Sequence, residues 1–311
     1  SRRNLRFPPA SLADWLNLAW VNPPSDLPKL RFAFRSVASE LRRQGLDGNT
    51  AFRRFLDEEL LITAQATCQH VPLLFAAPAL AYTNSRNDYL PGGMIQLPFS
   101  LMAVIGRSGG DVRLRTEVTA LQQTESGWAV QDQQGHTYTA SNVISNLPLW
   151  NLPSLMQEAA PKSWIQQEAN GLTQPWGAFT MSMAIRASLP PGTSLHHQIH
   201  LPEGATLPHT GSRSVFISLS HPEDHLRAPE GEQVLALSTH AAEPAAWQAL
   251  DKATYEARKQ EVTDAILGVL HKHWPPLQHT EVLYQTESTP RSWVQWTRRW
   301  QGAVGGVPQR M

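Results

Sequence analysis

Histidine spacing offers the first candidate chemistry in this sequence of 311 residues. His196, His197 and His200 lie close together, and His271 and His273 are two positions apart in a segment with helical periodicity. Side chains at that spacing on a helix point in different directions, so the second pair does not converge on one ion. We therefore predict no metal site. Cys68 is the single cysteine, which excludes an internal disulfide framework and a multi-cysteine zinc site.

Two glycine pairs are candidate positions for close contact with a ligand. Gly92 and Gly93 lie in a predicted turn, and Gly305 and Gly306 lie in the last segment of the chain. Glycine lets the backbone approach a flat ring or another backbone closely. An ordinary turn and an ordinary loop are the alternatives for these two pairs.

A predicted strand end is the third candidate. Asn146 and Pro148 follow an apolar stretch, 142–146, that reads as a buried strand. Sheets of α/β proteins bind ligands beyond the carboxyl ends of their strands, so these two residues are candidate ligand contacts. No side chain stands out as a catalytic acid or base, and the catalytic residues stay unassigned.

These candidates must be positioned by a mixture of helices and strands. Apolar residues at helical spacing predict helices, including a first one around Leu12 to Trp20. The further predicted helices are 30–43, one from 49–50 onward, 95–107 and 254–274. Alternating patterns predict strands at 112–115, 117–121, 179–186, 214–220, 233–239 and 281–287, and a hairpin of 127–130 with 136–140.

The order and spacing of several short motifs resemble the phytoene desaturase family of flavoproteins. The first block is Tyr89-Leu90-Pro91-Gly92-Gly93-Met94, followed by Asp111-Val112-Arg113, the strand around Val118 and the stretch Val143-Ile144-Ser145-Asn146. The second block runs from Thr289-Pro290-Arg291 to Gly305-Gly306-Val307-Pro308-Gln309 and resembles the closing flavin-side loop of that family. The spacing is most similar to bacterial and cyanobacterial desaturases of late carotenoid intermediates.

The resemblance implies an α/β fold with a partial FAD-binding Rossmann-like layer and a mixed α+β substrate domain, similar to amine oxidases and phytoene desaturases. It implies a helical part of the substrate domain at 1–87, part of the FAD-binding domain at 88–156, the substrate domain at 157–288 and a return to the FAD-binding domain at 289–311. It also implies that the backbone of Val118 contacts the adenine of FAD. Gly92, Gly93, Asn146, Pro148, Gly305, Gly306, Pro308 and Gln309 are the other implied cofactor contacts.

By resemblance, the expected activity is desaturation of a carotenoid-type polyene by hydride transfer to the flavin. The alternatives are a carotenoid cis–trans isomerase that uses reduced flavin, an amine-oxidase-like flavoprotein with the closing Trp293, Trp296 and Trp300 as an aromatic cage, and an inactive fragment or apolar-ligand binding module. The partner expected is the apolar polyene, without nucleic acid, since 26 basic and 26 acidic side chains balance.

The Gly-x-Gly-x-x-Gly fingerprint that grips a dinucleotide's pyrophosphate does not occur in the sequence. The resemblance places it upstream of residue 1 and a further flavin segment after residue 311, so the chain is expected to be an internal fragment that binds FAD weakly. The longest apolar run, 71–82, is too short to span a bilayer. A cytoplasmic location is expected, with peripheral membrane contact as an open alternative.

Overall fold

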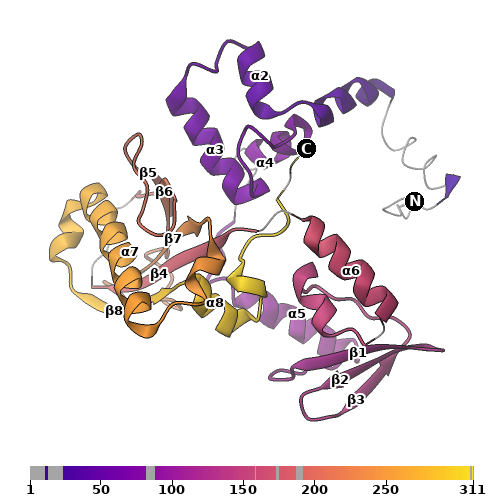
Figure 1. Ribbon diagram of the computed structural model, residues 1–311. Helices are drawn as coiled ribbons and strands as arrows, with labels where there is room; N and C mark the ends of the chain where they lie inside the picture. The colour runs from indigo at the N-terminus through magenta and orange to yellow at the C-terminus, as the bar shows by residue number, and fades with distance from the viewer. Residues whose placement is uncertain are drawn as a thin grey trace. The chain divides into compact units, whose positions relative to one another are not determined.

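The structure of the protein is a computed structural model that describes residues 11–12, 24–81, 88–157, 159–172, 175–186, 192–308 and 310. The chain forms two compact units. The first comprises Ser1–Asn87 with Pro308–Met311, and the second comprises Asp88–Val307. Figure 1 shows helices in the described part of the first unit and two sheets in the described part of the second.

Four helical elements make up the described part of the first unit: η1 (Pro24–Phe34), α2 (Val37–Arg43), α3 (Thr50–Ala64) and α4 (Leu73–Ala81). The predicted helix from about residue 49 is confirmed, and the Asn49 side chain caps it by accepting from the Phe52 N–H. The predicted helix 30–43 is wrong as one element, because Ser36 caps a new helix there by accepting from the Ser39 N–H. Most of the predicted helix from Leu12 to Trp20 lies outside the described residues.

The core of the first unit is small and aliphatic. It gathers side chains from α2, α3 and α4 around Leu60, Val71 and Cys68, which are fully buried. Burial raises the pKa of the Cys68 thiol, so the thiol stays protonated and is a packing group. Several apolar side chains of this unit are exposed, namely Phe52, Phe55, Ile62, Leu74 and Phe75. Peripheral membrane contact through them stays a prediction that liposome flotation would test. No helix among the described residues is long and apolar enough to cross a bilayer.

The second unit begins with a turn, α5 (Gln96–Arg107) and an antiparallel sheet, β1 (Val118–Thr124), β2 (Gly127–Asp132) and β3 (Thr137–Ala140). The predicted helix and hairpin are both confirmed. After the sheet come η3 (Leu149–Ser154) and α6 (Ala159–Gly171), and Leu121, Met156 and Ile165 form the small core that joins them.

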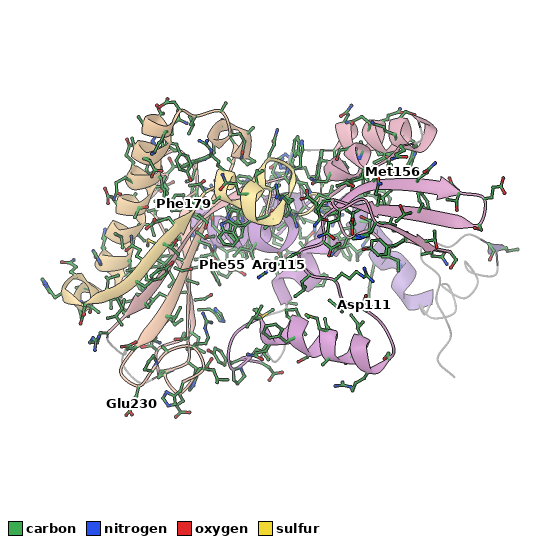
Figure 2. All side chains as sticks on the ribbon, turned by 90° about the horizontal axis from the view of Figure 1, so that it is seen from below. Phe55, Asp111, Arg115, Met156, Phe179 and Glu230 are labelled. Carbon is green, nitrogen blue, oxygen red and sulfur yellow. The ribbon has the colours of Figure 1, made fainter. Side chains whose placement is uncertain are left out.

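Two predicted strands of this region are wrong. Residues 112–115 are irregular, because Arg113 donates from Nε to the Asp111 carboxylate at 2.8 Å and Arg115 takes a left-handed φ of 55°. Figure 2 shows Asp111 and Arg115 on the segment that follows α5. Residues 142–146 are also irregular and exposed, and Ile144 is 97% exposed. Apolar residues form a buried strand only where a neighbouring strand pairs with them, and no described strand does so here.

The larger sheet consists of β4 (Gly177–Ile185), β5 (His196–His200), β6 (Ser214–Leu219), β7 (Gln233–Ala241) and β8 (Val282–Ser288). The strand order is β5-β6-β7-β4-β8, and each of the four neighbouring pairs is antiparallel. The predicted strands 179–186, 214–220, 233–239 and 281–287 are confirmed. Around the sheet lie η4 (Pro244–Trp247), α7 (Lys252–His273), η5 (Pro275–His279), α8 (Pro290–Thr297) and η6 (Trp300–Gly302).

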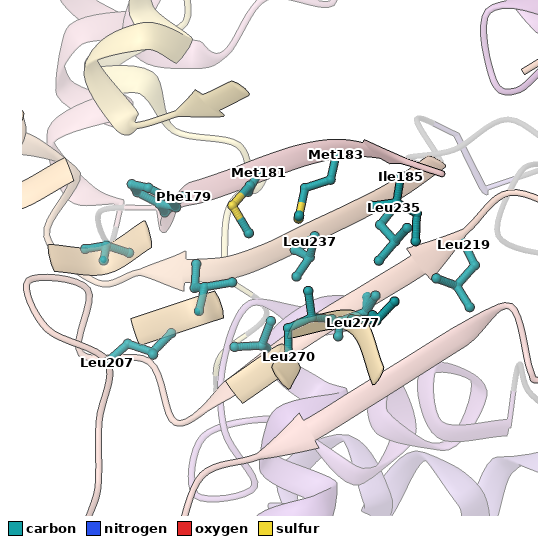
Figure 3. Packing of buried hydrophobic residues seen from close by; sticks show 14 of the residues in the cluster. Phe179, Met181, Met183, Ile185, Leu207, Leu219, Leu235, Leu237, Leu270 and Leu277 are labelled. Carbon is teal, nitrogen blue, oxygen red and sulfur yellow. The ribbon is translucent and has the colours of Figure 1, made fainter. Parts of the chain in front are cut away.

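The long helix α7 covers one face of this sheet. Phe179, Met181 and Met183 of β4 are buried in one cluster with Ile266 and Leu270 of the helix. Figure 3 shows the methionines and leucines interleaved between the strands and the helical segments. The predicted helix 254–274 is therefore confirmed, and Asp251 caps it by accepting from the Thr254 N–H.

The opposite face of the sheet carries small side chains. Successive residues of a strand point to opposite faces, so Thr180, Ser182 and Ala184 point away from α7. The register places Ala236 and Ser238 of β7 and Thr286 of β8 beside them, and Phe216 and Tyr284 lie farther along the same face. Ser182, Ala236 and Tyr284 are exposed. We call these eight residues the open face.

The hairpin of β2 and β3 is closed by a buried carboxylate. Asp132 accepts from the Tyr138 Oη at 2.8 Å, the Gln134 N–H at 2.8 Å and the His136 N–H at 3.0 Å. Burial alone would raise the pKa of Asp132, but the hydrogen bonds from Tyr138, His136 and Gln134 lower it to about 2. The ionised form therefore stabilises the folded hairpin.

Substitution Asp132→Asn should lower the melting temperature at neutral pH. Because the pKa is depressed in the folded state, the stabilisation is present above the ordinary value of 3.8 and is lost as pH falls toward about 2. The difference between wild type and variant should therefore shrink between about pH 4 and pH 2, measured by circular dichroism. Asp111→Asn, at an exposed carboxylate, is the control. A difference that stays constant with pH would contradict the role of the charge.

Candidate functional site

A cavity of about 620 Å³ lies beside the β1–β2 hairpin in the second unit. Its volume falls within the range of small-molecule sites. The walls come from β1, β2, the irregular segment before η3, η3 itself and the end of α8. The lining residues are Thr116, Glu117, Val118, Leu121, Val130, Val143, Ile144, Ser145, Asn146, Leu147, Asn151, Ser154, Leu155, Thr297 and Arg298.

Val118 lines this cavity at the first position of β1. It pairs with Asp132, and the register shifts between Val118 and Ala120. Such bulges bend a strand and redirect its groups, often next to functional sites. Val118 is 37% exposed, so the strand start faces an open space instead of a closed core.

Asn146 also lines the cavity, from the irregular segment that was predicted as a strand. Pro148 follows it as the residue that precedes η3 and is not a lining residue. The structure therefore brings Val118 and Asn146 together. It does so through a loop that lies against the hairpin, and the predicted carboxyl end of a buried strand is not present.

Gly92 and Gly93 lie at another place in the same unit. The Gly93 N–H donates to the Leu90 carbonyl at 2.9 Å, and Gly92 has a φ of 77°. Proline at the second position and a left-handed glycine at the third are typical of a type II turn. This turn does not contribute to the lining of the cavity. It contacts the loop between β6 and β7, where the Gly92 N–H donates to Asp224.

Gly305 and Gly306 follow η6 near the start of β4. The N–H groups of Val304 and Gly305 donate to the Trp176 carbonyl at 3.1 and 3.4 Å, and Arg299 donates from Nη2 to the Gly305 carbonyl at 2.8 Å. Neither glycine lines the cavity. Pro308 is grouped with the first unit, and Gln309 lies outside the described residues.

Asn151 is a residue of the cavity wall that the sequence patterns did not indicate. Its Nδ2 donates to the Arg298 carbonyl at 2.8 Å, and its Oδ1 accepts from the Trp300 N–H at 2.9 Å. The rings of Trp150 and Trp300 stack beside it, 5.5 Å apart and 12° from parallel. One carboxamide thus joins η3 to residues 298–302 at the end of α8, which we call the closing segment.

The closing segment is held in an unusual backbone conformation. Arg298 and Gln301 have left-handed φ values of 57° and 52°, which cost energy for residues other than glycine. Gly302 also has a positive φ, and any Cβ there would clash with the Pro290 carbonyl. The Asn151 hydrogen bonds and the tryptophan stack hold this conformation in place.

Charge at the cavity comes from Glu117 and Arg298. Their side chains lie 3.8 Å apart and are both exposed, so the pair contributes little stability. Arg291, at the start of α8, makes a different kind of contact: its Nη1 donates to the Leu250 carbonyl and its guanidinium lies over the Tyr255 ring.

The lining suits the adenosine portion of a flavin cofactor. Val118, Leu121 and Val130 offer apolar walls for a flat base, and Asn146 and Ser145 offer polar groups at the rim. When bound, FAD supplies the hydride chemistry, while the protein binds and orients it. Among the described residues there is no group of three or more His, Cys, Asp or Glu side chains that could hold a metal ion.

Known proteins share this architecture. Residues 15–308 match the family of flavin containing amine oxidoreductases, and this chain belongs to that family. An oxidoreductase from Methanosarcina mazei superposes with a TM-score of 0.58 at 16% identity, over 90% of this chain and 63% of that one. Cyclohexylamine oxidase from Brevibacterium oxydans gives 0.52 at 15% identity, over 88% and 57%. The fold is thus amine-oxidase-like, with mixed helices and antiparallel sheets, as predicted, and the predicted cofactor, FAD, is supported.

The chloroplastic prolycopene isomerase of Daucus carota is 25% identical over 261 residues, which is 82% of this chain and 42% of that protein. The chain therefore spans less than half the length of this relative. This similarity agrees with the resemblance of the motifs.

Asn151→Asp should loosen the closing segment. The acceptor for the Trp300 N–H is kept, but an oxygen replaces the donor that faces the Arg298 carbonyl, so one hydrogen bond is lost and two acceptors meet. We expect a loss of about 1–3 kcal/mol of unfolding free energy in urea and a weaker near-ultraviolet signal from the stacked tryptophans. Asn170→Asp, at the exposed end of α6, is the matched control. Equal behaviour of the two variants would contradict the role of Asn151.

Proposed function

We propose that this chain is part of an FAD-dependent enzyme that acts on a carotenoid-type polyene. The observation that carries the proposal is the open face of the larger sheet. The five strands place no Asp, Glu, Lys or Arg on that side, and its central side chains are Thr180, Ser182, Ala184, Ala236 and Ser238. Short side chains leave room for a long flat ligand, and the absence of Asp, Glu, Lys and Arg from this face of the strands avoids the cost of desolvating their charges.

Of the two polyene reactions, cis–trans isomerisation is the first candidate. The similarity to prolycopene isomerase favours it. Desaturation is the second candidate, which the resemblance of the motifs at 89–94 and 289–309 supports. Desaturation would remove two hydrogens from adjacent carbons, one as a hydride to the flavin and the other as a proton, whereas isomerisation leaves the electron count of the polyene unchanged.

The amine-oxidase reading finds less support. It needs an aromatic cage from Trp293, Trp296 and Trp300. Trp296 is 81% exposed, and Trp300 stacks on Trp150. A site for a cationic amine would also benefit from a carboxylate, which the open face does not carry.

The reaction can be identified from the mass of the product. Full-length protein carrying FAD is incubated with prolycopene in liposomes, with the flavin either oxidised or reduced. Isomerisation should change the absorption spectrum without a change of mass, and only with reduced flavin. Desaturation of a less unsaturated carotenoid should give a product lighter by two hydrogens per step. Unchanged substrate in every case, with FAD bound, would overturn the polyene proposal.

We further propose that the cavity beside Val118 takes the adenine of FAD. Val118→Glu would add a second carboxylate beside Glu117 and place a charge where the flat base packs. We expect at least tenfold weaker FAD binding, because an unpaired charge at a partly buried contact costs more than 1.4 kcal/mol, roughly a factor of ten. Flavin fluorescence titration measures the affinity.

Gln122→Glu is the matched control for this change. It adds the same charge to the same strand at an exposed position outside the cavity lining. Equal FAD affinity of the Val118 variant and the control would show that the adenine binds elsewhere.

A further inference from the structure

A buried carboxylate joins the glycine turn to the larger sheet. Asp224 lies in the loop between β6 and β7 and is 6% exposed. It accepts from the Tyr89 Oη at 2.6 Å. It also accepts from the Gly92 N–H, at 3.1 Å through Oδ1 and 2.9 Å through Oδ2. The partners are more than 130 positions away along the chain, so the contact connects two distant segments.

The groups around Asp224 favour its ionised form. The Tyr89 hydrogen bond lowers the pKa of Asp224, burial opposes it, and the N–H groups of Gly92 and Leu226 and the charge of Arg227 lower it further. Burial and the hydrogen bond to Asp224 raise the pKa of Tyr89, so its hydroxyl stays a donor. At neutral pH the contact is a charge-assisted set of hydrogen bonds, which is stronger and more directional than a neutral one.

Both sides of this contact are themselves fixed. On the turn side, Gly92 has the left-handed conformation that a type II turn requires, and the turn leads into α5. On the sheet side, the loop base is tied by Gln233 Nε2 to the Ser220 carbonyl at 2.8 Å and by the Val234 N–H to Ser220 Oγ at 3.0 Å. Gln233 begins β7, the strand that carries Ala236 and Ser238 of the open face.

Asp132 shows what such a carboxylate does when its role is local. It accepts from a tyrosine hydroxyl and two backbone N–H groups, but all its partners lie within the same hairpin. Asp224 accepts the same kinds of hydrogen bond, but it does so between the turn before α5 and the loop before β7. A carboxylate that stabilised only its own loop would not need donors from a turn that is distant along the chain.

We propose that Asp224 is a positioning residue that sets the place of the Gly92–Gly93 turn, and of α5 behind it, relative to the open face of the sheet. The inference rests on the proposed function, in which the open face is the polyene side, and on the motif resemblance, which implies that Gly92 and Gly93 contact the flavin cofactor. Tyr89 completes the anchor, and the His221 N–H donates to its hydroxyl oxygen at 3.2 Å. Reactivity between two bound partners falls steeply when they are misplaced by about 1 Å.

The test compares Asp224→Asn and Tyr89→Phe with Asp251→Ala in full-length protein carrying FAD. Asp224→Asn turns one acceptor oxygen into a donor that faces the Tyr89 or Gly92 donor. Tyr89→Phe removes one donor and leaves the Gly92 contact. Asp251→Ala is the control, since it also removes a carboxylate that accepts a backbone N–H, but at the exposed start of α7.

Three readouts are followed below the melting temperature of every variant. Hydrogen exchange of residues 89–93 should become at least tenfold faster in Asp224→Asn. The visible circular dichroism of the bound flavin should change. The kcat for the polyene should fall about tenfold with flavin content retained, since misplacement acts on the reaction step more than on cofactor loading. Tyr89→Phe should show smaller changes, and Asp251→Ala none.

Each result has one meaning. Wild-type flavin dichroism and wild-type kcat in Asp224→Asn would overturn the positioning role, whether or not its melting temperature falls. If the wild type itself converts no polyene, the proposed function fails. The hydrogen-exchange and flavin dichroism data then still show whether Asp224 positions the Gly92–Gly93 turn. Faster exchange without any change at the flavin would make Asp224 a stabilising residue only and overturn the inference.

Discussion

The structure of the second unit depends on the burial of one face of the larger sheet beneath α7. Met181, Leu237 and Ile266 are almost completely removed from solvent in this contact, and burial of such side chains is the main favourable contribution to folding. Because strand side chains alternate, the same burial puts Ser182 and Ala236 on the opposite side. The open face is thus a consequence of how the core is packed, and its residues are held in place by the strands of the sheet.

The segments around this sheet are attached to it in a different way. Apolar area fixes the sheet, whereas single polar side chains fix the segments around it. Asn151 holds the closing segment through two hydrogen bonds, and Asp224 holds the glycine turn through donors from Tyr89 and Gly92. Hydrogen bonds are directional and each is worth only about 1 kcal/mol net, so one substitution can move a segment without unfolding the protein. The positions of these two segments are therefore more sensitive to substitution of a single polar residue than the free energy of unfolding is.

The sequence predicts the elements that are specified locally. The hairpin at 127–140 follows from its turn residues, and α7 follows from the spacing of Val262, Ile266 and Leu270. The strand predictions for 112–115 and 142–146 fail, because a strand needs a neighbouring strand to pair with and an apolar run does not reveal whether one is present. Val118 and Asn146 could be named from the motifs, but their meeting at one cavity depends on a loop conformation. Asn151 and Asp224 could not be named from the sequence, because neither belongs to a periodic pattern. The role of a single amide or acid outside such a pattern becomes visible only when its distant hydrogen-bond partner is known.

The same reasoning explains why the sequence points to a flavoprotein family more readily than to a reaction. The buried carboxylates Asp132 and Asp224 both have lowered pKa values and spend their oxygens on structural donors, so neither is a suitable proton acceptor. Burial raises the pKa of the Cys68 thiol, which keeps it inert. The described residues therefore provide shape, an open face without Asp, Glu, Lys or Arg, and fixed spacing. Isomerisation and desaturation of a polyene make the same demands on those properties, and they differ in the electrons that the flavin gains. A family of such proteins can change its reaction while its packing and anchoring residues stay under the same physical constraints.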